Sequence, residues 1–167
     1  MKYNIARVAL ALSSLALSSL ASSCTSAPAD VSGVWSVNLT NGANGCMLSS
    51  WTVGETTSGV PMTITQSGST VTADIGGAAG VVLNVLLGTS RLTGVVSGSE
   101  VDLHADGRPG SEGACAYTGA LDIRLRVTGD TLTGATHWNF DANASPDCGY
   151  RATCDSTQAV NGARPPR

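Results

Sequence analysis

Apolar and polar residues alternate along much of the chain, which is typical of half-buried β-strands. The clearest case is residues 121–127, where Leu, Ile, Leu and Val share one face and Asp, Arg and Arg share the other. Similar alternation occurs at 71–75 and 101–105. The pattern predicts eight strands, near residues 33–40, 60–66, 70–75, 91–96, 100–105, 115–127, 131–139 and 148–159.

Three of the predicted connections are tight turns of similar sequence. Each places a glycine between small hydroxyl or acidic residues, at Gly68, Gly98 and Gly129. Glycine adopts the positive φ that a tight β-hairpin requires, because it has no Cβ. These segments therefore predict three β-hairpins.

The other four connections are long and alternate with the tight turns. They are expected at residues 41–59, 76–90, 106–114 and 140–147. Successive connections of an antiparallel meander lie at opposite ends, and closing the sheet removes its unpaired edges. The chain is therefore predicted to be all-β, an eight-stranded antiparallel up-and-down barrel with four long loops at one end. The apolar segment 76–90 is interpreted as a loop or a single helical turn over the barrel mouth.

The inward-facing positions predict a cavity inside this barrel. Gly94, Gly134, Ala73 and Ala105 share a face with the large apolar residues. An eight-stranded barrel can either fill itself or hold one small ligand, and small inward residues favour the second outcome. The predicted interior residues are Trp35, Val37, Leu39, Met62, Ile64, Val71, Ile75, Leu92, Val96, Val101, Leu103, Leu121, Ile123, Leu125, Leu132 and Trp138.

The first residues have the composition of a secretory signal peptide. Lys2 and Arg7 precede an apolar stretch at 8–20, and small residues follow it. Residues 1–23 are therefore assigned to a signal peptide, and the barrel domain is expected to span 32–163. A four-residue tail, 164–167, follows.

Cys24 comes directly after the small residues of the signal peptide. This arrangement resembles the bacterial lipobox, in which the cysteine is acylated and becomes the new N-terminus. Residues 24–31 would then be a lipidated cysteine and a short tether to the outer membrane or cell surface. Ordinary signal peptidase cleavage fits the same small residues, and it would make the protein periplasmic or secreted.

The cysteine count supports a special role for Cys24. The chain has 5 cysteines, and an exported protein is expected to pair the other four in disulfides. Those four are Cys46, Cys115, Cys148 and Cys154, all expected near the rim that carries the long loops. Three connectivities are open, and Cys46–Cys115 with Cys148–Cys154 is favoured.

Composition and charge exclude several functions. A net charge of −3 provides no basic surface for nucleic acid. Motifs of common hydrolases and phosphate-binding loops do not occur, so no catalytic residues and no cofactor are expected. A hydrolase would need two rim carboxylates to converge. The candidates are Asp102, Asp106, Glu112, Asp141 and Asp147.

One polar strand face could be considered as a metal site. Asp102, His104 and Asp106 alternate along a predicted strand. A solvated polar face opposite apolar residues explains the pattern better, because no second histidine or cysteine is placed beside it. No metal site is therefore predicted.

Three aromatic residues are candidates for ligand contacts at the open rim. Trp51 lies in the first long loop, Trp138 near the end of the seventh strand, and Tyr150 near the start of the eighth. Aromatic rings there can stack on an apolar ligand, although large residues of small domains also cap cores.

Gly33-Val34-Trp35, at the start of the first strand, resembles the Gly-x-Trp motif of the lipocalin and wider calycin barrels. The resemblance implies that the Trp35 indole packs against an arginine near the end of the last strand, for which Arg164 is the candidate. The chain is also similar to small bacterial lipoproteins with such a barrel. We therefore predict an exported, lipid-anchored monomer that binds a small apolar or amphipathic molecule at its open end. The prediction uses the signal peptide, the cysteine count and the small inward-facing residues together with these resemblances. The alternative is a filled structural barrel that contacts a macromolecular partner through its rim loops.

Overall fold

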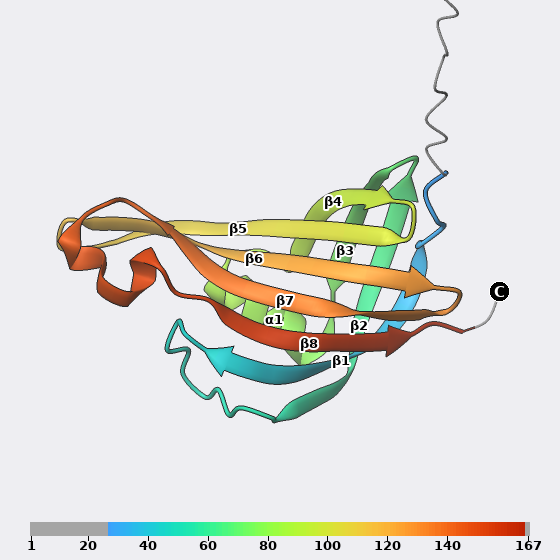
Figure 1. Ribbon diagram of the computed structural model, residues 1–167, viewed down its shortest axis with the longest axis horizontal. Helices are drawn as coiled ribbons and strands as arrows, with labels where there is room; N and C mark the ends of the chain where they lie inside the picture. Colours follow the sequence, from blue (N-terminus) through green and yellow to red (C-terminus); the bar gives the residue numbers. More distant parts are fainter. Residues whose placement is uncertain (1–26, 166–167) are drawn as a thin grey trace, which may run out of the picture.

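The computed structural model describes residues 27–165, which form a closed barrel of antiparallel strands in sequential order (Figure 1). Each strand pairs with its neighbours in sequence, and the first pairs with the last to close the ring. The strands are β1 (Gly33–Asn44), β2 (Thr56–Ser67), β3 (Thr70–Ile75), β4 (Arg91–Ser97), β5 (Glu100–Glu112), β6 (Cys115–Thr128), β7 (Thr131–Ala142) and β8 (Ser156–Ala163). The predicted all-β, eight-stranded up-and-down barrel is confirmed, and it is consistent with a lipocalin-like architecture. Cys24 and the signal-peptide segment lie outside the described residues.

The three predicted glycine turns gather at one end of the barrel, which we call the closed end (Figure 1). Gly68, Gly98 and Gly129 have φ values of 61°, 57° and 59°. They join β2 to β3, β4 to β5 and β6 to β7. The positive φ at each turn is the reason for glycine there, because a side chain would strain this backbone.

The segment that leads into β1 packs across the closed end. Val31 is fully buried, and its backbone N–H donates to Gln66 Oε1 at 2.8 Å. The Trp35 indole, also fully buried, donates from Nε1 to the Val31 carbonyl at 3.0 Å. Ala29 N–H donates to the Gly98 carbonyl at 2.7 Å, which ties this segment to a tight turn. Residues 29–31, which precede β1, therefore cover the closed end of the barrel.

Arg164, just after β8, completes the closed end. Its guanidinium carbon lies 4.5 Å from the centre of the Trp35 ring. The same group donates to the Ser32 carbonyl at 2.7 Å and to Asp130 Oδ1 at 3.1 Å. The structure thus brings together the two residues that the lipocalin resemblance pairs, and they join the first strand to the end of the last.

The core lies inside the barrel and consists of the inward-facing apolar residues. All of the predicted interior residues belong to this cluster, with Leu39, Ile75 and Trp138 only partly buried. Those three lie toward the end opposite the glycine turns, where the packing opens. We call that end the open end.

The inward-facing glycines Gly94 and Gly134 were predicted to leave space for a cavity, but their contacts in the structure indicate another role. A Cβ on Gly94 would overlap the carbonyl oxygen of Asp102 on β5, and a Cβ on Gly134 would overlap that of Arg124 on β6. Each glycine allows a neighbouring strand to approach closely, as β-sheet glycines at sharp bends commonly do. The two glycines are therefore explained by the close approach of the neighbouring strands and not by a need for empty volume.

The long connections differ from their predicted extents. Residues 106–114 are not a long loop. Strand β5 continues as far as Glu112 and β6 begins at Cys115, so only a tight turn joins them. The loop predicted at 41–59 is shortened by β1 and β2 to residues 45–55. The extra strand length extends β5, β6 and β7 as an arm beyond the rest of the barrel (Figure 1).

The segment 76–90 contains a helix longer than the predicted single turn. Helix α1 (Gly77–Leu86) has 10 residues, so the interpretation as a loop or a single turn was wrong in length. Its position over the barrel mouth is as predicted. The run Gly-Ala-Ala-Gly-Val-Val-Leu-Asn-Val-Leu contains helix-favouring Ala and Leu beside strand-favouring Val, so local preference alone did not separate the alternatives.

The last strand begins later than predicted. Residues 146–152 form the 3₁₀ helix η1 (Pro146–Ala152), and β8 starts only at Ser156. Pro146 occupies the first turn of η1, and the Ser145 hydroxyl accepts from the Asp147 N–H at 3.3 Å. These are ordinary helix-start features. Cys148 and Cys154 therefore lie before the last strand, and the strand predicted at 148–159 was wrong at its start.

The favoured disulfide pairing was wrong. Cys46 pairs with Cys154, and Cys115 pairs with Cys148, with Cα–Cα distances of 4.7 and 4.8 Å. Cys46 follows β1 and Cys154 precedes β8, and these two strands are neighbours only because the barrel closes. All four cysteines expected in disulfides do form them, which favours an oxidising, non-cytoplasmic compartment.

Candidate functional site

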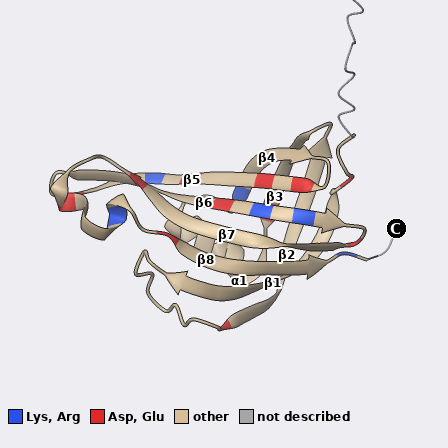
Figure 2. Ribbon diagram, viewed as in Figure 1, with Lys and Arg blue, Asp and Glu red and all other residues tan. Residues whose placement is uncertain are grey.

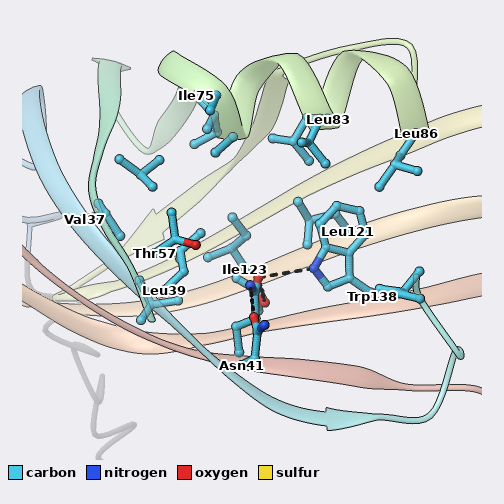
Figure 3. A pocket seen from close by; sticks show the side chains of 18 of the residues that line it. Val37, Leu39, Asn41, Thr57, Ile75, Leu83, Leu86, Leu121, Ile123 and Trp138 are labelled. Carbon is cyan, nitrogen blue, oxygen red and sulfur yellow. Dashed lines mark hydrogen bonds between the residues drawn. The ribbon is translucent and has the colours of Figure 1, made fainter. Parts of the chain in front are cut away.

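A cavity of about 400 Å³ opens between the barrel interior and helix α1 (Figure 3). Pockets that hold small molecules begin at about 300 Å³ and are mostly lined by apolar side chains. This cavity has that size and that lining. It is lined by Val37, Leu39, Asn41, Leu48, Ser49, Ser50, Trp51, Thr57, Val60, Met62, Ile75, Ala78, Ala79, Val82, Leu83, Leu86, Leu121, Ile123, Leu125, Thr136, Trp138, Gln158 and Val160.

Helix α1 forms the roof of the cavity. Leu83 is buried on its inner face, while Val81 and Val85 on its outer face are 64% and 78% exposed. Gly80 sits so close to the end of β3 that a Cβ there would overlap the Ile75 carbonyl oxygen. The glycine therefore allows the helix to lie directly on the barrel rim.

A group of polar side chains interrupts the apolar wall opposite α1. Gln158 on β8 accepts at Oε1 from the Thr136 hydroxyl at 3.2 Å and from Trp138 Nε1 at 3.4 Å. Its Nε2 donates to Asn41 Oδ1 at 2.8 Å (Figure 3). Asn41 Nδ2 in turn donates to the Thr52 carbonyl at 3.2 Å. The group links β1, β7 and β8 within the cavity wall.

The loop between β1 and β2 forms one side of the cavity entrance. Trp51 lines the cavity, and its Nε1 donates to the Gly42 carbonyl at 3.0 Å. Asn44 holds the loop from its other end, because its side chain exchanges hydrogen bonds with the backbone of Leu48 at 2.8 and 3.0 Å. Trp51 is therefore fixed at the rim by backbone contacts.

Of the three aromatic residues predicted for ligand contacts, the structure brings Trp51 and Trp138 together in one cavity wall. Tyr150 is elsewhere: it lies exposed on η1, with the Arg151 guanidinium 5.0 Å from its ring. The assignment of Tyr150 as a rim residue assumed that residue 148 began a strand. Because η1 replaces that part of the strand, Tyr150 lies away from the cavity.

Sequence analysis missed the polar members of the site. Gln158 was placed at the end of a strand predicted to stop at 159, so its inward position beside Val160 was not recognised. Thr136 and Asn41 also went unnoticed, because a threonine or asparagine within a predicted strand does not by itself indicate a binding site. Their convergence depends on the register between β7, β8 and β1.

The charged residues lie mainly outside this site. Figure 2 shows acidic and basic residues along β5 and β6, whereas α1 and β1 contain none. Asp102 pairs with Arg124 at 3.4 Å, and Glu100 pairs with Arg126. Each of these exposed cross-strand ion pairs contributes little to the free energy of unfolding.

Four of the five carboxylates considered for a hydrolase, all but Asp141, contact separate partners. Asp106 contacts His104 Nε2 at 3.0 Å, and Glu112 contacts Arg151 at 2.7 Å. Asp147 accepts from the Ala114 N–H at 2.8 Å. Among residues 27–165, no group of three or more His, Cys, Asp or Glu side chains has the arrangement of a metal site.

His104 is held between two carboxylates on the outer face of the sheet. Its Nδ1 lies 2.8 Å from Asp122 Oδ1, and its Nε2 lies 3.0 Å from Asp106. The hydrogen bond to Asp122 raises the pKa of His104 above its ordinary value of 6.5, against the opposing effect of partial burial. Burial alone would raise the pKa of Asp122, but hydrogen bonds from His104 and Asn139 outweigh it and lower that pKa.

We expect His104 to make the barrel less stable as the pH rises above about 6.5. A histidine with a raised folded pKa stabilises the protein fully below the unfolded pKa and loses that contribution through the folded pKa. The effect is below about 1 kcal/mol, because the pair is half exposed and screened by solvent. Urea unfolding between pH 6 and 8.5 measures it, and His104→Gln should remove that part of the slope.

NMR titration of the His104 imidazole provides the direct check. Asp122→Asn removes the main acceptor and should bring the pKa of His104 down toward its ordinary value. A wild-type pKa at or below 6.5 would contradict the arrangement of His104 described above.

No helix within residues 27–165 has both the length and the apolar character needed to cross a membrane. Comparisons of the chain with protein-family models, with curated proteins and with solved structures find no match. The functional assignment therefore rests on the geometry of the barrel and its cavity.

Proposed function

We propose that this protein binds a small apolar or amphipathic molecule in the cavity at the open end of its barrel. The cavity of about 400 Å³ under α1 is the observation that carries the proposal. A barrel of eight strands can fill its interior with side chains, as the closed end does around Trp35. Toward the open end the interior is left unfilled and lined by aliphatic and indole groups, which is typical of a ligand site.

The proposed role is binding and not catalysis. Most of the acidic residues considered for catalysis are engaged in separate pairs, as Asp102 with Arg124 and Glu112 with Arg151 illustrate. None of the described residues that line the cavity is acidic. Acid–base chemistry needs such groups within hydrogen-bond reach of a shared substrate.

The protein is proposed to be exported and anchored to the cell envelope through an acyl chain on Cys24. The two disulfides support export, since such bonds persist in oxidising compartments. They use all the other cysteines, which leaves Cys24 for lipidation. Because the chain enters the barrel across its closed end, the tether would leave from there and the open end would point away from the anchoring membrane. This arrangement resembles small bacterial lipoproteins with a lipocalin-like barrel.

A second candidate is contact with a macromolecular partner through the open rim. Val81 and Val85 on α1 and Met47 in the β1–β2 loop are largely exposed. Exposed apolar side chains that gather on one surface often mark interaction sites. This candidate would use the outer face of α1, whereas ligand binding uses its inner face.

Filling the cavity tests the first proposal. Ala79→Trp adds a large ring to the inner face of α1, where Ala79 lines the cavity. We expect the dissociation constant for the neutral fluorescent probe N-phenylnaphthylamine to rise by about tenfold or more, because the ring occupies the apolar space. Fluorescence titration of the purified protein measures this change.

The matched control is Val81→Trp, which adds the same ring to the exposed outer face of α1. It should leave probe binding within about twofold of the wild type, and circular dichroism should show both variants folded. Equal binding by the Ala79→Trp variant and the wild type, or equal weakening by both substitutions, would place the probe outside the cavity and overturn the proposal.

A further inference from the structure

The cavity wall provides no charge to a ligand. Every described residue that lines it is apolar or neutral and polar. A charged group taken from water into such surroundings loses its hydration without gaining an ion pair, which costs several kcal/mol in proteins. The lining therefore disfavours a ligand whose ionised group enters the barrel.

The cavity does provide a directed hydrogen-bonding group, the amide of Gln158. The orientation of this amide is determined by its neighbours, because the Trp138 indole can only donate and must face the amide oxygen at 3.4 Å. The Thr136 hydroxyl donates to the same oxygen at 3.2 Å. Both lone pairs of Oε1 are therefore used within the protein.

The nitrogen of the same amide retains a donor. It carries two hydrogens, and one is used by the bond to Asn41 Oδ1 at 2.8 Å. The second hydrogen is not used by these contacts, and the Thr136 hydroxyl oxygen retains its lone pairs. The polar group in the wall is therefore suited to a ligand oxygen that accepts a hydrogen bond.

We propose that the ligand is a neutral amphipathic molecule, of the class of long-chain esters, amides or alcohols, whose oxygen accepts from Gln158. Its apolar part lies between the barrel interior and the inner face of α1, against Leu83 and Leu121. This inference rests on the proposed function and specifies its ligand class. An ionised fatty acid with the same apolar chain is disfavoured, because none of the described residues that line the cavity is basic and could pair with its carboxylate.

Competition binding tests the inference on the full mature chain. N-phenylnaphthylamine is bound first and then displaced by methyl decanoate or by decanoate at pH 7. We expect methyl decanoate to compete at least about tenfold more tightly, because only decanoate must bury a charge. Competition of equal strength, or stronger competition by decanoate, would overturn the inference while leaving probe binding, and thus the proposed function, intact.

Gln158→Met tests the hydrogen bond itself. The substitution keeps the length of the side chain and removes both its donor and its acceptor. We expect methyl decanoate to lose about threefold to tenfold more affinity than the probe loses, the usual effect of one hydrogen bond, because only the ester oxygen accepts from Gln158. Asn161→Met is the matched control, since Asn161 is exposed on the same strand, and it should leave both affinities unchanged.

The outcomes separate the two proposals. If the probe binds the wild-type protein but Gln158→Met weakens ester binding no more than probe binding, the inference about Gln158 is wrong and the cavity remains a binding site. If the probe does not bind the wild-type protein, the proposed function fails and the inference fails with it. Should Gln158→Met not fold, the comparison of ester and acid on the wild type still decides the ligand class.

Discussion

Replacing both Cys46 and Cys154 by alanine is expected to lower the free energy of unfolding by about 4 to 5 kcal/mol. The two cysteines are separated by 108 residues along the chain. A cross-link that closes a loop of roughly 100 residues restricts the unfolded chain by about 4.7 kcal/mol in the loop-entropy treatment. The bond joins the loop after β1 to the residue that shortly precedes β8, at the open end.

The control is removal of the other disulfide, between Cys115 and Cys148. These residues are separated by 33 positions, so the same treatment gives about 3.7 kcal/mol. All four cysteines are buried, so the loss of packing is similar in the two double variants and the comparison isolates loop length. Urea unfolding under non-reducing conditions measures both. A smaller loss for the Cys46–Cys154 pair would contradict the prediction.

Trp35→Ala is expected to lower the free energy of unfolding by about 3 to 5 kcal/mol, as truncation of a buried tryptophan commonly does. Trp35 is fully buried at the closed end. The substitution leaves a cavity there and removes the ring that lies 4.5 Å from the Arg164 guanidinium. It also removes the donor to the Val31 carbonyl.

Trp51→Ala is the matched control for this prediction. Trp51 is only partly buried, on the loop between β1 and β2. We expect Trp51→Ala to lower the free energy of unfolding by less than about 1 kcal/mol, because water can enter the space that a truncated rim residue leaves. Thermal and urea unfolding distinguish the two, and equal costs for Trp35→Ala and Trp51→Ala would show that the closed end is not held as described.

Both predictions concern the contact between β1 and β8. This pairing joins the two ends of the domain, so forming it requires closing the longest loop in the barrel. Cys46–Cys154 holds the two strands together at the open end, and Arg164 with Trp35 holds them at the closed end. The residues of β1 and β8 that line the cavity lie between these two contacts along the strands. The contacts therefore hold the two strands together on both sides of the cavity wall.

The parts of the fold that the sequence predicted depend on neighbouring residues. Alternation across 121–127 identified the inward face of β6, because successive side chains of a strand point to opposite faces. Gly68, Gly98 and Gly129 identified the tight turns, because positive φ is a local requirement. The Gly33-x-Trp35 motif pointed to Arg164 through resemblance, and the structure places the two side chains in contact.

The parts of the site that the sequence did not predict depend on which strands become neighbours. Gln158 reaches Asn41 only because β8 pairs with β1, and it reaches Thr136 only because β7 pairs with β8 in one register. Tyr150 was misplaced because a 3₁₀ helix, and not a strand, precedes β8. The length of α1 also escaped prediction, since its apolar run suits a helix, a loop or a strand.

The sequence by itself determined that this chain forms an antiparallel barrel with hairpins at one end and paired cysteines near the other. Only the tertiary structure decided which cysteines pair, how far β5 and β6 extend, and which polar side chains enter the cavity. The physical reason is the range of the interactions. Side-chain alternation and turn geometry act within a few residues, whereas barrel closure brings together residues separated by more than a hundred positions, as Cys46 and Cys154 are with their separation of 108.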